Sequence, residues 1–138
     1  MVCRSGLKCV AYSQVYLVKE LRVPYDLHEF TQKDVDSELS NARKVKLNKH
    51  PNVVDVLSVS SDILWNGRLT NLIQMEQCQT DLYRFISRHK QENTTIELRK
   101  YYNIIADIFG GLTHLHKIGL IHRDIKAANS ASIVYESN

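Results

Sequence analysis

The last third of this sequence limits the possible folds more than any other part, because a long helical pattern there leads straight into a charged loop. From Leu98 to Leu115 apolar residues recur at alternating steps of three and four, which predicts a core helix with one apolar face. Gly119 has the position of the glycine that often follows a helix C-terminus. Residues 121–129, I-H-R-D-I-K-A-A-N, come next, so a rigid helix would deliver a carboxylate, a cation and an amide to one loop. The apolar seam consists of Leu98, Tyr101, Ile105, Ile108, Leu112 and Leu115.

Residues 122–129 match the pattern H-R-D-x-K-x-x-N at every fixed position. This is the catalytic-loop pattern of eukaryotic protein kinases, so the chain resembles that family, and the lysine two positions after Asp124 resembles its serine/threonine class. The resemblance implies that Asp124 accepts or orients the proton of the substrate hydroxyl, Lys126 neutralises the transferred phosphoryl group and Asn129 holds Mg²⁺. An ordinary polar turn after a helix would explain any one of these residues, but not the set.

The segment Val15–Leu21 alternates as a strand does, and its apolar face also carries Lys19. A helical pattern follows from about Val35 to Leu47, and Glu38 falls inside its apolar stripe. A lysine on an apolar face needs a counter-charge, which Glu38 would provide. The resemblance implies that this lysine anchors ATP and that the glutamate is its partner on the helix.

Two alternatives to that pairing stay open. Lys19 would snorkel to solvent if Glu38 were a solvated surface residue. Counting back from His50-Pro51-Asn52 by the spacing usual in kinases reaches Ser40 or Asn41 instead of the glutamate. Of these, we expect Glu38 to meet the lysine, because it has both the charge and the inward phase.

A hairpin and a connecting segment are expected in the middle of the chain. Val53–Val59 is typical of a strand, and Asn66-Gly67, between Ile63–Trp65 and Leu69–Met75, is the residue pair of a tight hairpin turn. Residues 72–78 resemble the last upper-lobe strand and the hinge of a kinase, with Met75 beside the adenine pocket. The resemblance implies that backbone groups from Glu76 to Cys78 bind adenine. It also implies that Asp81 meets the ribose, although Asp81 is equally suited to cap a helix.

Three local features of the helical part have structural explanations. Thr94 and Glu97 have capping-box spacing ahead of the long helix. Gly110-Gly111 inside that helix indicates either a tolerated defect or a point of close packing. His114 and His116 face different directions on a helix, so we expect packing or surface roles for them and no metal site.

These patterns predict an α+β chain with a small antiparallel sheet and one helix, followed by a helical layer. The resemblance implies a bilobal kinase fold truncated after the catalytic loop, with an upper lobe at about residues 1–75, a hinge at 76–80 and a partial lower lobe at 81–138. ATP and Mg²⁺ are the implied cofactors, and serine or threonine side chains of proteins the implied substrates.

Two elements of the kinase pattern are missing from the 138 residues: a G-x-G-x-x-G before Lys19 and a D-F-G after Asn129. We therefore expect this chain alone to transfer phosphate poorly or not at all. The chain would then be a fragment of an active kinase. The alternative to such a fragment is a non-catalytic kinase-like module that acts by binding nucleotide or a partner.

Composition narrows the remaining possibilities. The net charge of +3 is spread along the chain, which argues against nucleic acid as a partner. Three cysteines without paired spacing favour reduced thiols in a cytoplasmic or nuclear protein. No signal peptide or membrane-spanning pattern is visible, and the sequence leaves the oligomeric state open.

Overall fold

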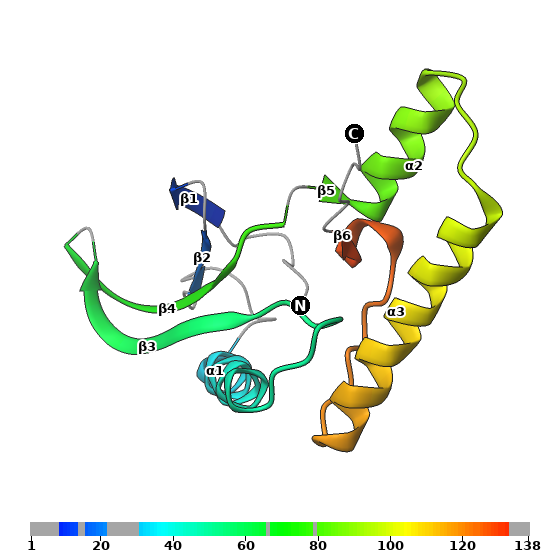
Figure 1. Cartoon of the computed structure of the whole chain (residues 1–138). Coiled ribbons are helices and arrows are strands. Elements are labelled where there is room, and N and C mark those ends of the chain that lie inside the picture. The colour runs from blue at the N-terminus through cyan, green and yellow to red at the C-terminus, as the bar shows by residue number, and fades with distance from the viewer. Residues whose placement is uncertain (1–8, 14–15, 22–30, 66, 79, 133–138) are drawn as a thin grey trace. The chain divides into compact units, whose positions relative to one another are not determined.

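The computed structural model describes residues 9–13, 16–21, 31–65, 67–78 and 80–132, and these form two compact units (Figure 1). The sheet unit holds the described residues of 3–49 and 54–77. The helical unit holds those of 50–53 and 78–138. The architecture is α+β, as the sequence predicted.

The sheet unit is built on four antiparallel strands in the order β1-β2-β4-β3 (Figure 1). The predicted hairpin is confirmed, since Trp65 pairs with Arg68 and Gly67 has the positive φ of +74° that glycine tolerates best. Val15, the first residue of the predicted strand, lies outside the described residues. The strands are β1 (Cys9–Ser13), β2 (Tyr16–Leu21), β3 (Val56–Trp65) and β4 (Arg68–Glu76).

One long strand replaces the two short segments expected before the hairpin. β3 runs without interruption through Val56–Trp65, and its register against β4 shifts between Ser60 and Ile63. Asp62 lies inside this irregularity with φ of 52°, and its N–H donates to Asn71 Oδ1 at 3.2 Å. A β-bulge therefore carries the strand across the polar Ser-Ser-Asp stretch.

Helix α1 (Gln32–Leu47) packs on the sheet through β3 and β4. It begins three residues before the predicted Val35, because the Thr31 N–H donates to Asp34 Oδ2 at 2.7 Å and so caps an earlier turn. Of the predicted stripe of Val35, Leu39, Ala42 and Val45, the first three are buried and Val45 is half-buried. The three buried residues share the core with Leu21, Val56, Leu72, Ile73 and Met75.

The helical unit contains two α-helices and a short two-stranded pairing. The backbone N–H of Leu82 donates to the Ser130 carbonyl at 2.8 Å, which fixes the start of the first helix beside the end of the described chain. Lys100 Nζ lies 4.9 Å from the centre of the buried Phe85 ring, a cation–π contact. The elements are β5 (Thr80–Asp81), α2 (Leu82–Gln91), α3 (Leu98–Lys117), the 3₁₀ turn η1 (Ala127–Asn129) and β6 (Ala131–Ser132).

The C-terminal end of α3 follows the predicted pattern. Gly119 has φ of +74°, its N–H donates to the His116 carbonyl at 3.0 Å, and the Leu120 N–H donates to the Leu115 carbonyl at 2.9 Å. This pair of bonds is the Schellman arrangement. The glycine therefore ends the helix and turns the chain toward the charged loop.

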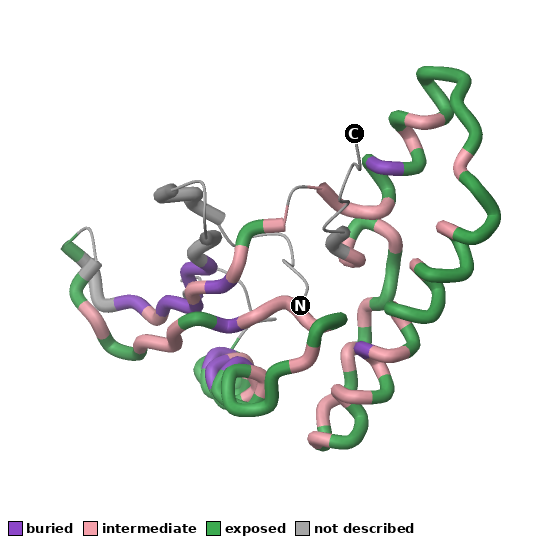
Figure 2. The backbone as a smooth tube through the Cα atoms, viewed as in Figure 1, coloured by how far each residue is buried: buried purple, intermediate pink, exposed green. Residues whose placement is uncertain are grey.

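The predicted start and burial of α3 need correction. The N-cap is Glu97, which makes no side-chain capping bond, while Thr94 Oγ1 donates instead to the His89 carbonyl at 3.3 Å. The seam has the predicted period, yet Leu98 is 67% exposed and Ile105 49% (Figure 2). Helical period gives the direction of a side chain but not what covers it, and no described element covers this half of the seam.

The paired glycines of α3 mark a close approach between this helix and Asn52. Close packing, and not a tolerated defect, is therefore the explanation for them. A Cβ at Gly111 would lie 2.4 Å from the Asn52 carbonyl oxygen, so only glycine allows this contact. The rings of His50 and His114 stack beside it, with centroids 4.7 Å apart. None of the helices in the described ranges is long and apolar enough to cross a bilayer.

Candidate active site

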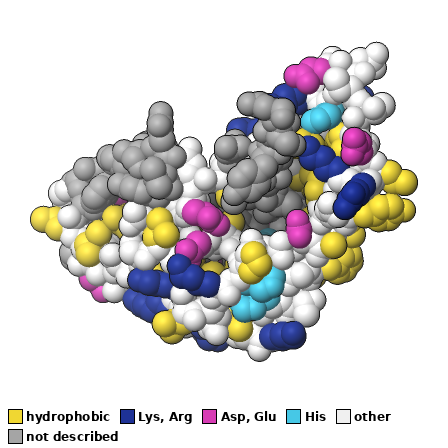
Figure 3. All heavy atoms as spheres, viewed as in Figure 1, with side chains coloured by type: hydrophobic (Ala, Val, Ile, Leu, Met, Phe, Trp, Pro, Cys, Tyr) yellow, Lys and Arg dark blue, Asp and Glu magenta, His cyan; other side chains and the backbone are white. Residues whose placement is uncertain are grey.

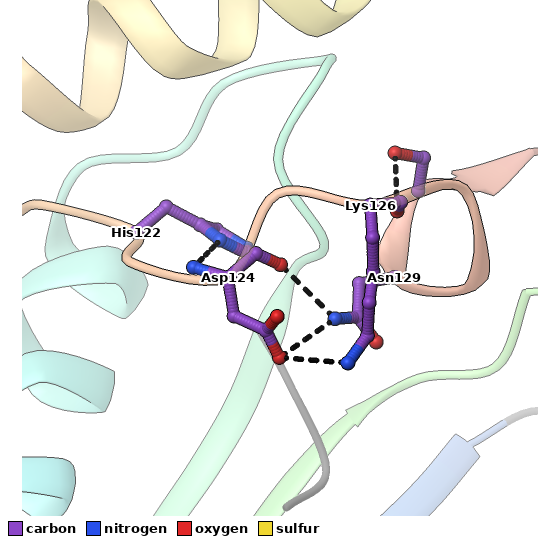
Figure 4. Close-up of polar contacts among 5 residues, drawn as sticks. His122, Asp124, Lys126 and Asn129 are labelled. Carbon is purple, nitrogen blue, oxygen red and sulfur yellow. Dashed lines mark hydrogen bonds and ion pairs between the residues drawn. The ribbon is translucent and has the colours of Figure 1, made fainter.

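The loop after α3 gathers its three candidate side chains within hydrogen-bond distance (Figure 4). Lys126 Nζ lies 3.0 Å from Asp124 Oδ2, and Asn129 Nδ2 donates to the same oxygen at 3.1 Å. Asn129 Nδ2 also donates to the Asp124 carbonyl at 3.0 Å. One carboxylate is therefore held by a cation and an amide that come from its own loop.

The backbone before this carboxylate is bent into an uncommon conformation. Arg123 has φ of 63°, a left-handed value that costs energy for a residue with a side chain. The two residues that flank Arg123 are joined by a hydrogen bond, in which the Asp124 N–H donates to His122 Nδ1 at 3.4 Å. Burial lowers the pKa of His122 below its ordinary value, against the opposing influence of the Asp124 charge. A neutral imidazole thus keeps the lone pair that this contact requires.

Asn129 is oriented so that it could also serve a metal ion. Because both hydrogen bonds to Asp124 use Nδ2, the amide oxygen Oδ1 is left as an acceptor. Among the described residues no group of three His, Cys, Asp or Glu side chains could enclose a metal. One amide oxygen next to a carboxylate suits Mg²⁺, which commonly takes only one or two protein ligands.

The sheet unit contains a second candidate, the ion pair expected from the sequence. Lys19 Nζ lies 2.5 Å from Glu38 Oε1, and the lysine side chain is only 3% exposed. Strand β2 holds the lysine opposite Ile73 of β4, and α1 carries the glutamate. Glu38, and not Asn41, is therefore the partner of Lys19.

The residues expected near the adenine and the ribose of a nucleotide also have structural surroundings of their own. The Glu76 N–H donates to the Asp55 carbonyl at 3.0 Å, while Glu76 Oε1 accepts from the Asp55 N–H at 2.8 Å. Cys78 is half-buried. Asp81 caps α2, where its Oδ1 accepts from the Arg84 N–H at 2.8 Å. Asp81 therefore caps a helix, which is one of the two roles expected for it.

Comparison with known sequences decides the family. Residues 5–132 match the family described as Protein kinase domain. The chain belongs to this family. The kinase segment therefore includes both the loop and the ion pair, and the α+β fold agrees with it.

Several curated kinases are similar to this chain. It is 34% identical over 84 residues to the sporulation protein kinase mde3 of Schizosaccharomyces pombe, which covers 61% of the chain and 14% of that protein. It is 23% identical over 114 residues to the serine/threonine-protein kinase KIN4 of Saccharomyces cerevisiae, which covers 80% of the chain and 13% of that protein. It is 24% identical over 86 residues to cyclin-dependent kinase 11.1 of Caenorhabditis elegans, which covers 62% of the chain and 11% of that protein. The chain thus spans a small part of the length of each relative.

Some contacts of the kinase structure were not anticipated from its sequence. Lys49 Nζ lies 2.6 Å from Asp55 Oδ2, and the other oxygen of Asp55 is buried without a described hydrogen-bond partner. His114, for which a packing or surface role was expected, stacks on His50, a contact that the sequence did not predict. His50 and His114 are far apart in sequence, so no local spacing could have indicated their stacking.

Proposed function

We propose that this chain carries phosphoryl-transfer residues of a serine/threonine protein kinase that uses ATP and Mg²⁺. The observation that carries the proposal is the cluster of Asp124, Lys126 and Asn129, in which the side-chain contacts are 3.0 and 3.1 Å. Moving a phosphoryl group needs little covalent help and much positioning and charge neutralisation. A carboxylate, a cation and an amide fixed on one loop meet that need.

Each member of the cluster has a distinct role in this proposal. Asp124 is 30% exposed, so its carboxylate remains accessible to accept or orient the proton of a substrate hydroxyl. Lys126 is 54% exposed and is free to shift from the carboxylate toward a transferred phosphoryl group, whose negative charge it would neutralise. Asn129 restrains the Asp124 side chain through Nδ2.

Asn129 would hold Mg²⁺ through Oδ1, the one polar atom of its side chain that Asp124 does not use. Mg²⁺ held at this oxygen would supply neutralisation of the negative charge on the transferred phosphoryl group. The chain's own contribution is to fix the amide, because the two Nδ2 hydrogen bonds set which way the oxygen points.

We assign the remaining nucleotide contacts by the same chemistry. Lys19, kept beside Glu38, would contact ATP phosphates. Since the N–H of Glu76 is occupied by Asp55, adenine would have to use the Glu76 carbonyl and the backbone of Cys78. Asp81 would have to share its capping carboxylate with a ribose hydroxyl.

The substrate class and the location are part of the proposal. Lys126, two positions after Asp124, and the similarity to the serine/threonine-protein kinase KIN4 both support transfer to serine or threonine of proteins. A cytoplasmic or nuclear location follows from the reduced thiols expected of the three cysteines. The second candidate, a non-catalytic nucleotide-binding module, keeps the Lys19 and Asn129 roles without the transfer step.

The test measures binding and transfer in parallel on the purified 138-residue chain. Binding of a fluorescent ATP analogue should require Mg²⁺ and weaken about tenfold in Asn129→Ala, whereas Asn93→Ala in the exposed α2–α3 loop should bind normally. Any label moved from γ-³²P-ATP to a protein substrate should appear on serine or threonine and fall at least about 100-fold in Asp124→Asn. Binding without transfer would select the non-catalytic candidate. Binding without Mg²⁺ dependence would contradict both.

A further inference from the structure

A surface pocket lies in the helical unit, away from the residues of the catalytic loop. Its volume is about 330 Å³, and it is open to solvent between the end of α2 and the segment leading into α3. Thr94 contributes to its rim. The other lining residues are Ile86, His89, Lys90, Thr95, Ile96 and Tyr101.

Hydrogen bonds hold the wall of this pocket in place. The Thr94 N–H donates to the His89 carbonyl at 2.9 Å, and Thr94 Oγ1 donates to the same oxygen at 3.3 Å. Asn93 before it has φ of 54°, and its N–H donates to the Lys90 carbonyl. The loop therefore folds back on the last turn of α2 as a formed wall, which limits the ordering cost for a ligand.

The pocket combines an apolar lining with a cationic rim. Ile86 is 37% exposed and Tyr101 39%, so apolar surface is open to an incoming side chain. Lys90 is exposed and makes no ion pair with any part of the chain that the structure describes. His89 Nδ1 bonds the Phe85 carbonyl at 3.0 Å, and because a carbonyl only accepts, that nitrogen carries the hydrogen.

The segment of sequence that forms the pocket is predominantly basic. Between Leu82 and Tyr101 five Lys or Arg residues stand against two Glu residues. Figure 3 shows Lys, Arg and His side chains next to hydrophobic ones on the part of the surface that α2 and α3 form. Exposed Lys90 is the Lys or Arg side chain among the lining residues. A ligand that complements the pocket must be anionic and must also have an apolar group.

We propose that this pocket docks an acidic peptide segment of another protein, with one aliphatic or aromatic side chain inserted and Asp or Glu residues on either side. The inserted side chain would cover Ile86, Ile96 and the Tyr101 ring, while a flanking carboxylate would approach Lys90. This is a short-peptide anchor rather than a broad interface. It does not depend on phosphoryl transfer, and it lies on other elements than the catalytic loop.

Two other occupants fit the surface less well. A nucleic-acid backbone favours an unbroken positive track, but exposed Glu92 and Glu97 interrupt this one. A second copy of the chain offers the acidic segment around Asp34-Val35-Asp36, but its apolar Val35 is buried on the inner face of α1. Neither presents an apolar side chain between accessible acidic ones as a short peptide does.

The experiment measures fluorescence polarisation of a labelled nine-residue peptide with one leucine flanked by Asp and Glu, titrated with the 138-residue chain without ATP. Saturable binding is expected, weakened at least about fivefold by Lys90→Glu and more by Ile96→Asp, but not by Lys117→Glu at the exposed far end of α3. The peptide with serine in place of leucine should also bind more weakly. Circular dichroism establishes that each variant is folded.

Three results would overturn the docking proposal. One is the absence of saturable binding by the folded chain at concentrations up to about 1 mM. Another is equal binding by the Lys90→Glu and Lys117→Glu variants, which would make the contact non-specific. The third is tighter binding of a single-stranded oligonucleotide at the same residues. Because no nucleotide is present, any of these leaves the proposed kinase chemistry untouched.

Discussion

The Nζ atom of Lys19 lies 2.5 Å from Oε1 of Glu38, and it is the lysine, at 3% exposure, that is buried. The contact joins the second strand of the sheet to the helix packed on it, across 19 positions of sequence. A buried ammonium is tolerated only when it is paired. The glutamate therefore holds α1 in register with the sheet as well as setting the position of the lysine.

Removing only the glutamate charge should destabilise the sheet unit more than removing the glutamate and lysine charges together. Glu38→Gln removes the carboxylate that pairs with a buried ammonium, and we expect a loss of about 3 kcal/mol in the free energy of unfolding. The double variant Lys19→Met/Glu38→Leu should recover most of this loss. Chemical denaturation measures both, and Glu97→Gln, at an exposed position without a side-chain cap bond, is the control. A double variant less stable than Glu38→Gln would refute the account.

The paired glycines of α3 should respond differently to alanine. At Gly111 the new Cβ would meet the Asn52 backbone oxygen at 2.4 Å, so Gly111→Ala should cost about 1 to 3 kcal/mol despite the gain in helix propensity. At Gly110 it would meet the Asn52 side-chain oxygen at 3.1 Å, which can rotate away. Gly110→Ala should therefore be neutral or stabilising by up to about 1 kcal/mol. Thermal unfolding of the pair tests this, and equal effects would contradict the close approach.

These contacts show how far the sequence alone leads. The order of strands and helices, the Asn66-Gly67 hairpin and the glycine at the end of α3 follow from local patterns, and all are formed. The partner of Lys19 was also predictable, because charge and helical phase both selected Glu38. Each of these depends on neighbours in sequence or on one strong physical requirement.

Other features depend on tertiary surroundings that spacing does not encode. The capping-box spacing of Thr94 and Glu97 was misleading, because Thr94 uses its hydroxyl to close the end of α2 instead. The seam of α3 has the right period, yet Leu98 and Ile105 are exposed. The stack of His50 on His114 required knowing that two distant segments meet.

The stability of the helical unit should depend on pH through His122. Burial lowers its pKa in the folded chain below the ordinary value of about 6.5. The unfolded chain therefore binds a proton first as the pH falls, so stability is fully present above about pH 6.5 and is lost as the pH drops toward the folded pKa. Denaturation at pH 7.5 and 5.5 should show a smaller drop for His122→Gln than for the original chain. An equal drop would exclude His122 as the source.

The most direct measurement locates the metal ion at Asn129. Mn²⁺ replaces Mg²⁺ and is added with ATP to the ¹⁵N-labelled 138-residue chain, and NMR records which amide signals broaden near the paramagnetic ion. We predict selective broadening of the Asn129 side-chain amide and the Asp124 backbone amide, with the Asn93 signals in the α2–α3 loop unchanged, and loss of this pattern in Asn129→Ala. Unchanged Asn129 and Asp124 signals while ATP and Mn²⁺ are bound would contradict the assignment of this loop as the magnesium-binding part of a kinase site.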